Sequence, residues 1–180
     1  MWCRPYIALT PDWCWVLDDG TGKVAGYIIC APDTPGFVKK YRNDFLAVAK
    51  NNGLEQPAEP DTAKDLATQF RKDVFNPEIM LQSEFPTLVQ QYPAHLHIDI
   101  LPSHQGQGWG EKMIATLLEK LQAKQVPGVH LGMAAANHRA GKFYDRLGFG
   151  RFGEMNEQGE LGRKGGAVYR VKATKRSDAA

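Results

Sequence analysis

Residues 105–110 read Gln-Gly-Gln-Gly-Trp-Gly, and the segments that flank this glycine loop decide the fold. Before the loop, the apolar run His95-Leu-His-Ile-Asp-Ile-Leu101 ends at Pro102 and indicates a strand. Strand, glycine loop and helix in this order direct free backbone N–H groups to one point, a site for an anion such as phosphate. The helix is predicted at residues 111–122, where Met113, Ile114, Leu117, Leu118 and Leu121 share one face.

The loop does not match two familiar phosphate-binding loops. Glu111 and Lys112 follow it, where a P-loop needs Lys and then Ser or Thr. Its Gly-x-Gly-x-Gly spacing differs from the Gly-x-Gly-x-x-Gly of dinucleotide-binding folds, and no acidic residue closes a second strand about 20 residues later. Taken alone, the loop also fits a tight strand-to-helix turn that binds nothing.

A second strand–helix unit follows the first. Residues 129–133 predict a buried strand after the Pro127-Gly128 break. Asn137 is a candidate N-cap for the next helix, and Gly148 is a candidate stop at its end. One apolar face of this helix is formed by Ala140, Phe143, Tyr144 and Leu147.

The two units together resemble the GNAT superfamily of acetyl-CoA-dependent N-acetyltransferases. Gln105-x-x-Gly108-x-Gly110 matches its coenzyme A motif, and Asn137-x-x-Ala140-x-x-Phe143-Tyr144-x-x-Leu147-Gly148-Phe149 matches its second characteristic block. Residues 14–20, 24–27, 35–40 and 92–99 also resemble the acetyltransferase-like C-terminal domain of O-GlcNAcase and its stand-alone bacterial relatives. The likeness covers roughly residues 13–155.

This resemblance implies an α/β fold with a mixed, mostly antiparallel central sheet flanked by helices. We expect one domain over residues 1–173, with a helical insertion at 36–92 before the coenzyme-binding strand and a disordered tail at 174–180. Family members normally begin with a strand and one or two helices, but here only about a dozen residues precede Trp13. The front wall of the acceptor site is therefore expected to be short, missing or supplied by a partner chain, with a truncated chain as an alternative.

Local patterns place the remaining elements. Residues 13–17 and 24–30 predict a hairpin of two strands. Residues 81–92 predict a short helix interrupted at Pro86, and residues 151–155 and 167–171 predict closing strands around a loop at 156–166. Two amphipathic helices separated by a polar link at 51–61 are predicted from Phe37, Val38, Tyr41, Phe45 and Val48 and from Leu66, Phe70 and Val74.

Acetyl transfer to an amine needs a neutral amine, a donor for the oxyanion and a proton for the leaving thiolate. Tyr144 matches the tyrosine that protonates the thiolate in the family, although it also fits a core aromatic. Asp99 and His97 are the candidate bases, but an orienting role for Asp99 and structural roles for the histidines are equally open. His95, His97 and Asp99 alternate with Leu96, Ile98 and Ile100 along the predicted strand. Where other members often carry a base, this chain has Ala94 and Leu96, unless a strand bulge reverses the alternation.

The resemblance also implies the cofactor contacts and a single cosubstrate, acetyl-CoA, with no metal. Loop amides would hold the pyrophosphate, and the backbone of residues 100–102 would pair with the pantetheine arm. The full set is Ile100, Leu101, Pro102, Gln105, Gly106, Gln107, Gly108, Trp109, Gly110, Asn137, Ala140, Phe143 and Tyr144.

Composition limits the other function classes. The 180 residues carry a net charge of +2, which is too small to argue for a nucleic-acid partner. The sequence contains no apolar run of about 18 residues, so no membrane span is expected. The three cysteines, Cys3, Cys14 and Cys30, have no metal-binding spacing and favour a reduced, cytoplasmic protein.

Three functions remain open at this point. The first is an N-acetyltransferase that acts on a primary amine of a small molecule, with a homodimer considered because of the short N-terminus. The second is an inactive pseudo-acetyltransferase that serves as a binding module. The third, acetylation of a basic protein tail, would want a cluster of acidic residues, and those of this chain are scattered.

Overall fold

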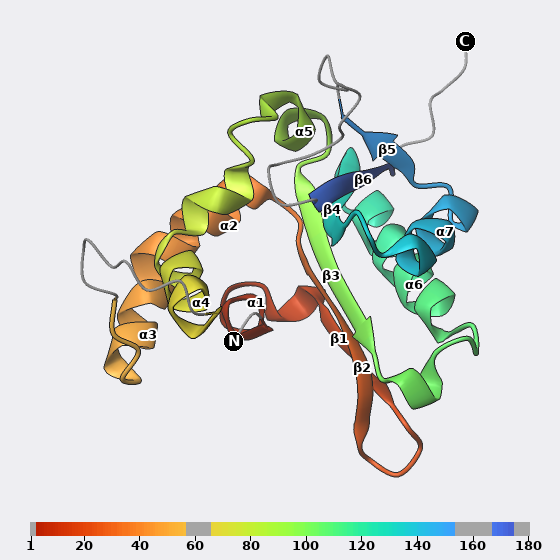
Figure 1. The fold of residues 1–180 in the computed structure, drawn as a ribbon, viewed down its shortest axis with the longest axis horizontal. Coiled ribbons are helices and arrows are strands. Elements are labelled where there is room, and N and C mark those ends of the chain that lie inside the picture. The colour runs from red at the N-terminus through yellow and green to blue at the C-terminus, as the bar shows by residue number, and fades with distance from the viewer. Residues whose placement is uncertain (1–2, 57–65, 154–166, 175–180) are drawn as a thin grey trace.

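A six-stranded sheet in the order β1-β2-β3-β4-β6-β5 organises the chain (Figure 1). The computed structural model describes residues 3–56, 66–153 and 167–174. The β3–β4 pair is parallel and the other neighbouring pairs are antiparallel, so the sheet is mixed and mostly antiparallel as expected. The strands are β1 Cys14–Asp18, β2 Val24–Ala31, β3 Ala94–Ile100, β4 Gly128–Ala134, β5 Gly150–Phe152 and β6 Ala167–Ala173.

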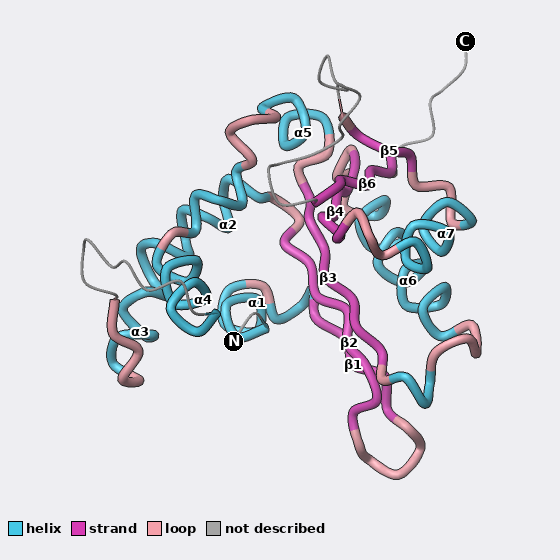
Figure 2. Tube along the Cα trace, in the orientation of Figure 1, coloured by secondary structure: helices cyan, strands magenta, loops and turns pink. Residues whose placement is uncertain are grey.

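Helices cover both faces of this sheet, as Figures 1 and 2 show. On one face, α6 (Trp109–Ala123) and α7 (His138–Arg146) pack against the strands. The predicted stripe of α6 is confirmed, because Met113, Ile114, Leu117 and Leu121 are buried in the main core, and burying one such side chain contributes about 1.5–3 kcal/mol. The opposite face is covered by α1 (Cys3–Leu9) and α2 (Thr34–Lys40), while α3 (Leu46–Asn51) and α4 (Leu66–Phe75) lie farther from the sheet.

A π turn at Tyr41–Phe45 joins α2 to α3 and changes which residues face the core. In a regular helix, steps of four residues drift by about 40° each, so Val48 would lie nearer to the core stripe than Ala49. The wider π turn removes this drift. The structure therefore buries Phe37, Tyr41, Phe45 and Ala49, and it leaves Val48 50% exposed, so the prediction of Val48 as a core residue was wrong.

Two other expected boundaries differ. Pro86 begins helix α5 (Pro86–Gln91) instead of interrupting a longer one. Proline has no backbone N–H, and the first residue of a helix does not need one because its N–H has no partner within the helix. Pro77–Leu81 forms a separate 3₁₀ turn. The predicted loop at 156–166, the end of the strand predicted at 151–155, and part of the polar link lie outside the described residues.

The N-terminal segment is packed against the sheet. Helix α1 and the 3₁₀ turn Pro11–Trp13 precede β1, and the Tyr6 ring is 2% exposed between β2, β3 and α2. At the other end of the chain, the backbone N–H of Thr174 donates to the Pro127 carbonyl over 3.1 Å, and residues 175–180 lie outside the described part. No helix among the described residues is long and apolar enough to cross a membrane.

Candidate active site

The glycine loop is held in shape by its own glutamines. The Gln105 side-chain amide donates to the Ile100 carbonyl over 2.7 Å, and the Gln107 amide donates to the Ser103 carbonyl over 2.9 Å. A 3₁₀ turn at Pro102–His104 leads from β3 into the loop. Both glutamines therefore brace the loop backbone, and of the two only Gln105 lines the neighbouring cavity.

Two glycines of the loop have distinct structural roles. Gly108 caps α6 with a φ of +83°, a conformation that residues with a Cβ atom avoid. At Gly110, a Cβ atom would stand 3.0 Å from the Phe143 ring, so glycine allows α7 to pack closely against the start of α6. Among the described residues, no side chain caps the first turn of α6. Its amide groups therefore point outward at the positive end of the helix dipole, which suits a bound anion.

Strands β3 and β4 separate after a short contact. They pair only through Ala94 with Val129 and His95 with His130. Beyond these pairs, β3 stays bonded to β2 and β4 stays bonded to β6, each on its other edge. A cavity of about 950 Å³ lies beside the open edge of β3. The site residues predicted from the sequence that line it are Asp99, Ile100, Gln105, Gly106, Gly108, Gly110, Asn137, Ala140, Phe143 and Tyr144.

Five predicted site residues do not line this cavity. Leu101 is 53% exposed beyond the end of β3. Pro102 begins the 3₁₀ turn before the loop, and Gln107 bonds to the Ser103 carbonyl. Trp109 packs on the main core, with the Lys112 ammonium group 4.4 Å from its ring centroid. His97 faces the side of β3 that α1 covers.

Asn137 has the capping role that its position predicts. Its side-chain oxygen accepts from the Ala140 backbone N–H over 3.0 Å and begins α7. The side chain also lines the cavity, where its amide NH₂ group remains a donor for a ligand.

Tyr144 is buried at the inner end of the cavity. Its ring packs edge-on against Phe143 and Phe149, with ring centroids 5.1 Å and 5.5 Å away. Burial and, second, the negative charge of Asp99 raise the pKa of Tyr144 to about 12. Its hydroxyl bonds to none of the described residues. Tyr144 is therefore a protonated phenol that can donate to a group in the cavity.

Asp99 stands close enough to Tyr144 to act on its ionisation, and it lines the same cavity. The Tyr27 hydroxyl donates to Asp99 Oδ2 over 2.6 Å, which leaves Oδ1 for another partner. The β2–β3 register runs unbroken from His95 to Ile100, so the bulge that would have reversed the alternation is not present. His95, His97 and Asp99 share one face, and Leu96 packs in the main core on the other.

His95 is fully satisfied by structural partners. The Thr34 hydroxyl donates to the Pro93 carbonyl over 2.6 Å, so it must accept from His95 Nδ1–H over 2.7 Å. His95 Nε2 is then an acceptor for the Tyr6 hydroxyl, also at 2.7 Å. Burial lowers the pKa of His95 well below its usual range, and the ring stays neutral in this chain of hydrogen bonds.

The other two histidines near this chain differ in accessibility. His130 is buried and its Nδ1 bonds to the Tyr92 carbonyl over 2.6 Å, a structural role. His97 keeps an exposed side chain, with its ring edge-on to Tyr6 at 5.5 Å. The protein atoms around His97 desolvate it and lower its pKa, while the charge of Asp99 acts in the opposite sense.

The predicted set left out seven residues that line the cavity, and three of them are cations. Arg139, Lys142 and Arg146 of α7 line its rim, and they recur at intervals of three and four residues. This spacing on a predicted helix is a readable signal, because it collects the cations on one face.

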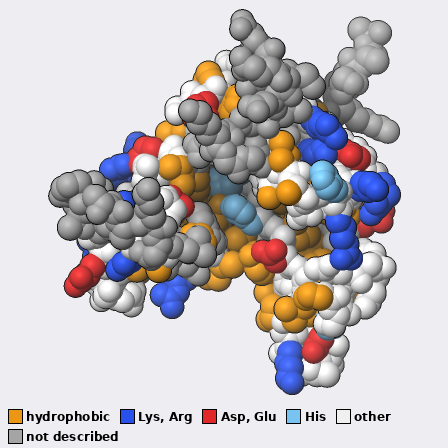
Figure 3. Space-filling model, viewed as in Figure 1, with side chains coloured by type: hydrophobic (Ala, Val, Ile, Leu, Met, Phe, Trp, Pro, Cys, Tyr) orange, Lys and Arg blue, Asp and Glu red, His pale blue; other side chains and the backbone are white. Residues whose placement is uncertain are grey.

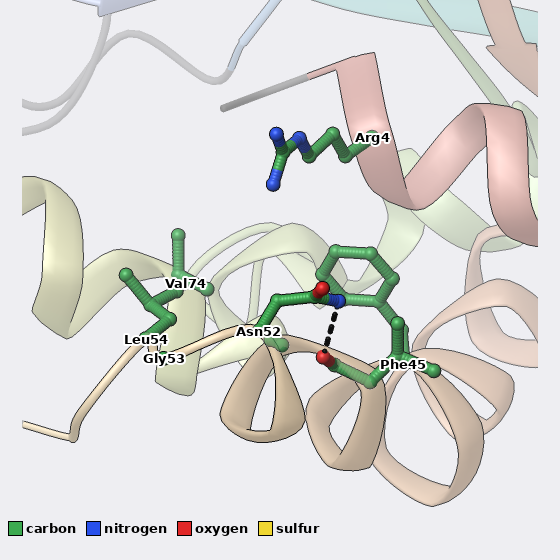
Figure 4. Close-up of a pocket in the computed structure, with 8 residues that line it drawn as sticks. Arg4, Phe45, Asn52, Gly53, Leu54 and Val74 are labelled. Carbon is green, nitrogen blue, oxygen red and sulfur yellow. Dashed lines mark hydrogen bonds between the residues drawn. The ribbon is translucent and has the colours of Figure 1, made fainter.

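A second, smaller cavity of about 380 Å³ lies between α1, α3 and α4 (Figure 4). Arg4 reaches over it, with Phe45, Leu54 and Val74 around it, and Asn52 bonds back to the Val48 carbonyl over 2.8 Å. This cavity contains no residue of either sequence motif. The larger cavity is therefore the candidate active site. No group of three or more His, Cys, Asp or Glu side chains in the described chain is arranged to hold a metal ion.

Comparisons with known proteins agree with this geometry. The family model described as the acetyltransferase (GNAT) family matches residues 84–149. The crystal structure of SsHAT is 37% identical, with a TM-score of 0.81, and the alignment covers 96% of this chain and 78% of that one. Two more distant structures share the fold. One is described as an acetyltransferase (18% identity, TM-score 0.58, 96% and 76% covered), and the other is PH1933 from Pyrococcus horikoshii OT3 (16% identity, TM-score 0.52, 96% and 71% covered).

Proposed function

Because the chain belongs to the acetyltransferase (GNAT) family, an acyltransferase family whose cosubstrate is acetyl-CoA, we propose that it transfers the acetyl group to a primary amine of a small molecule. One observation carries the proposal. A single cavity joins the glycine loop to Tyr144 and Asp99, which supply an anion site, an acid and a base in one space. The narrower likeness to the O-GlcNAcase domain stays a prediction.

The cofactor runs along the open edge of β3 in this proposal. The Leu101 N–H donates to the Ala25 carbonyl in β2 over 2.8 Å, so the alternate residues Ile98 and Ile100 turn their N–H groups to the opposite edge. The amide groups of the pantetheine arm can pair there like an added strand. The outward amides at the start of α6 then hold the pyrophosphate.

Asp99 is the proposed base. Its Oδ1 takes a proton from the incoming ammonium group, and the neutral nitrogen then attacks the thioester carbonyl carbon. The C–N bond forms, the C–S bond breaks, and the Tyr144 hydroxyl gives its proton to the leaving thiolate. The nitrogen, positively charged after the attack, loses its second proton to water, which returns a proton to the Tyr144 phenolate, and Asp99 releases the first proton to solvent. His97, the other candidate base, packs edge-on against Tyr6 on the α1 side and does not line the cavity.

The charge of Asp99 affects the pKa of Tyr144 in the direction that the reaction needs. Asp99 as a carboxylate helps to keep the Tyr144 proton in place before the reaction. Once Asp99 has taken the amine proton, that negative charge is gone and the pKa of Tyr144 falls. The phenol therefore becomes a stronger acid when the thiolate needs a proton.

The acceptor approaches from the face of β3 that carries Asp99. Val16, Tyr27 and Asp99 lie side by side across β1, β2 and β3. Val16 is 64% exposed there and Leu101 is 53% exposed, so apolar surface flanks the carboxylate. This surface favours a substrate whose amine is attached to an uncharged, apolar group over a polycation. A homodimer that completes the site, and a cytoplasmic location, stay predictions, and sedimentation at micromolar concentration checks the first.

A transfer assay tests the proposal. The chain is incubated with acetyl-CoA and a panel of alkyl, aromatic and polyamine substrates, and the thiol released and the acetamide formed are measured by absorbance and mass spectrometry. We expect acetamide from at least one amine, formed about 10²–10⁴-fold more slowly by Tyr144→Phe, with acetyl-CoA affinity within about twofold of the parent. A Tyr144→Phe variant at full rate would remove Tyr144 as the acid. Cofactor binding without acetamide from any amine would reject the proposed acceptor class.

A further inference from the structure

Helix α7 places three cations, Arg139, Lys142 and Arg146, on the rim of the main cavity. Their spacing of three and four residues puts them on one helix face. All three side chains are exposed. Figure 3 shows Lys and Arg side chains gathered on the side of the molecule that α7 occupies. The pyrophosphate site at the glycine loop does not need these residues, because backbone amides form it.

Part of this charge pattern is unfavourable for α7, although Arg146 lies in the last turn, where the helix dipole favours a cation. Arg139 lies in the first turn, where the helix dipole is positive and where α7 has no acidic residue. Lys142 and Arg146 are like charges four residues apart, which also destabilises a helix. None of the three has an ion pair within the described ranges, since Asp145 bonds to Arg170 over 2.6 Å. An anion bound at this rim would offset the repulsion.

The rim is adjacent to the glycine loop. Gly110 at the start of α6 touches the Phe143 ring of α7, so the two helices meet where the loop ends. Coenzyme A carries a second anionic group beyond its pyrophosphate, the 3′-phosphate on the ribose. A ligand whose pyrophosphate lies on the loop therefore brings this group to the neighbouring wall of the same cavity.

We propose that Arg139, Lys142 and Arg146 form a subsite for the 3′-phosphate of coenzyme A. The chain then selects free coenzyme A thioesters over 3′-dephospho forms and over thioesters on the phosphopantetheine arm of a carrier protein. The inference rests on the proposed function for the position of the cofactor. Each charge-assisted contact to the phosphate contributes roughly tenfold in affinity, and arginine can bind phosphate through two N–H groups at once.

Calorimetric titration with two ligands, acetyl-CoA and acetyl-3′-dephospho-CoA, tests this subsite. We expect the parent chain to bind acetyl-CoA about 10- to 100-fold more tightly than the dephospho form. Arg139→Gln, Lys142→Gln and Arg146→Gln should each reduce that ratio, and the triple variant should bring it to within about twofold of unity. Lys124→Gln, at the exposed far end of α6, removes the same charge away from the cavity and should leave the ratio unchanged.

The outcomes separate the two proposals. Equal binding of both ligands by the parent, or an equal loss for both ligands in the triple variant, would overturn the subsite but leave cofactor binding in place. Binding of neither ligand by the parent would overturn the proposed function and the subsite with it. A preference that weakens as salt is raised from 50 to 500 mM in the parent but not in the triple variant would support the subsite.

Discussion

The polar groups on the two sides of strand β3 differ in whether they have hydrogen-bond partners within the described chain. On the side of α1, Tyr6, His95 and Thr34 form a closed chain of hydrogen bonds that ends on the Pro93 carbonyl. On the side of α6 and α7, the Tyr144 hydroxyl has no partner among the described residues, and the first turn of α6 has no side-chain cap. Buried polar groups that are satisfied stabilise a fold, whereas groups left open at a cavity are available to a ligand.

The same contrast between satisfied and open polar groups also appears along a single face of the strand. His95 and His97 are two residues apart on one face of β3, yet His95 bonds through both ring nitrogens to structural partners while His97 remains exposed. Asp99 lies at the boundary, with Oδ2 bonded to Tyr27 and the carboxylate lining the cavity. We therefore expect substitutions on the closed side to change stability, and substitutions on the open side to change binding or rate.

The largest effect is expected at the boundary. Asp99→Asn keeps an acceptor for the Tyr27 hydroxyl but cannot take a proton, so kcat should fall by about 10²–10⁴-fold. His97→Gln is the matched substitution on the same face and should change kcat by less than about tenfold. Steady-state kinetics with the best amine of the panel measures both. A larger loss for His97→Gln than for Asp99→Asn would move the base to His97.

A smaller effect, on stability alone, is expected on the closed side. Tyr6→Phe leaves the buried Nε2 of His95 without its donor, which should cost about 1–3 kcal/mol of unfolding free energy. Tyr41→Phe is the control, because the Tyr41 ring is also buried but its hydroxyl bonds to none of the described residues, and it should cost less than about 0.5 kcal/mol. Urea unfolding measures both. Equal stability of the two variants would mean that the hydrogen bond to His95 contributes nothing.

The smallest effect is a change in how stability depends on pH. Burial lowers the pKa of His95 in the folded chain. Below about pH 6.5, His95 therefore binds a proton in the unfolded chain but stays neutral in the folded chain. Stability is therefore lost as pH falls below that value, by up to about 1.4 kcal/mol per pH unit for this group. His95→Gln should flatten the curve by that amount, while His97 and His130, whose pKa values are also lowered, keep the remaining slope in both proteins. Urea unfolding at pH 7.0, 6.0 and 5.5 measures it, and parallel curves for parent and variant would contradict it.

Features set by neighbouring residues could be predicted from the sequence. The glycine loop, the stripe of α6, the Asn137 cap and the place of Tyr144 on α7 all follow from spacing within one strand–helix unit. The alternation of His95, His97 and Asp99 along β3 was also readable, because the period of a strand is two.

Features set by distant residues could not be predicted. The bond from Tyr6 to His95 joins positions 89 residues apart, and nothing in either local pattern indicates it. The π turn that brings Ala49 to the core in place of Val48 packs against α1, which is distant in the sequence. The cations of α7 were readable as a cluster, but only the folded chain places them on the same cavity as the loop.

Calorimetric titration with acetyl-CoA of the parent, Gly108→Glu and Gly22→Glu tests the central claim most directly. Both glycines have nearly the same φ, +83° and +84°, and both have open space where a Cβ would stand, so the two variants carry equal strain and equal new charge. Only Gly108 lines the cavity. We predict that Gly22→Glu binds like the parent and that Gly108→Glu binds at least about 100-fold more weakly, because its carboxylate repels the pyrophosphate at the start of α6. Equal binding by all three proteins, or equal loss in both variants, would contradict the assignment of the loop as the anion site.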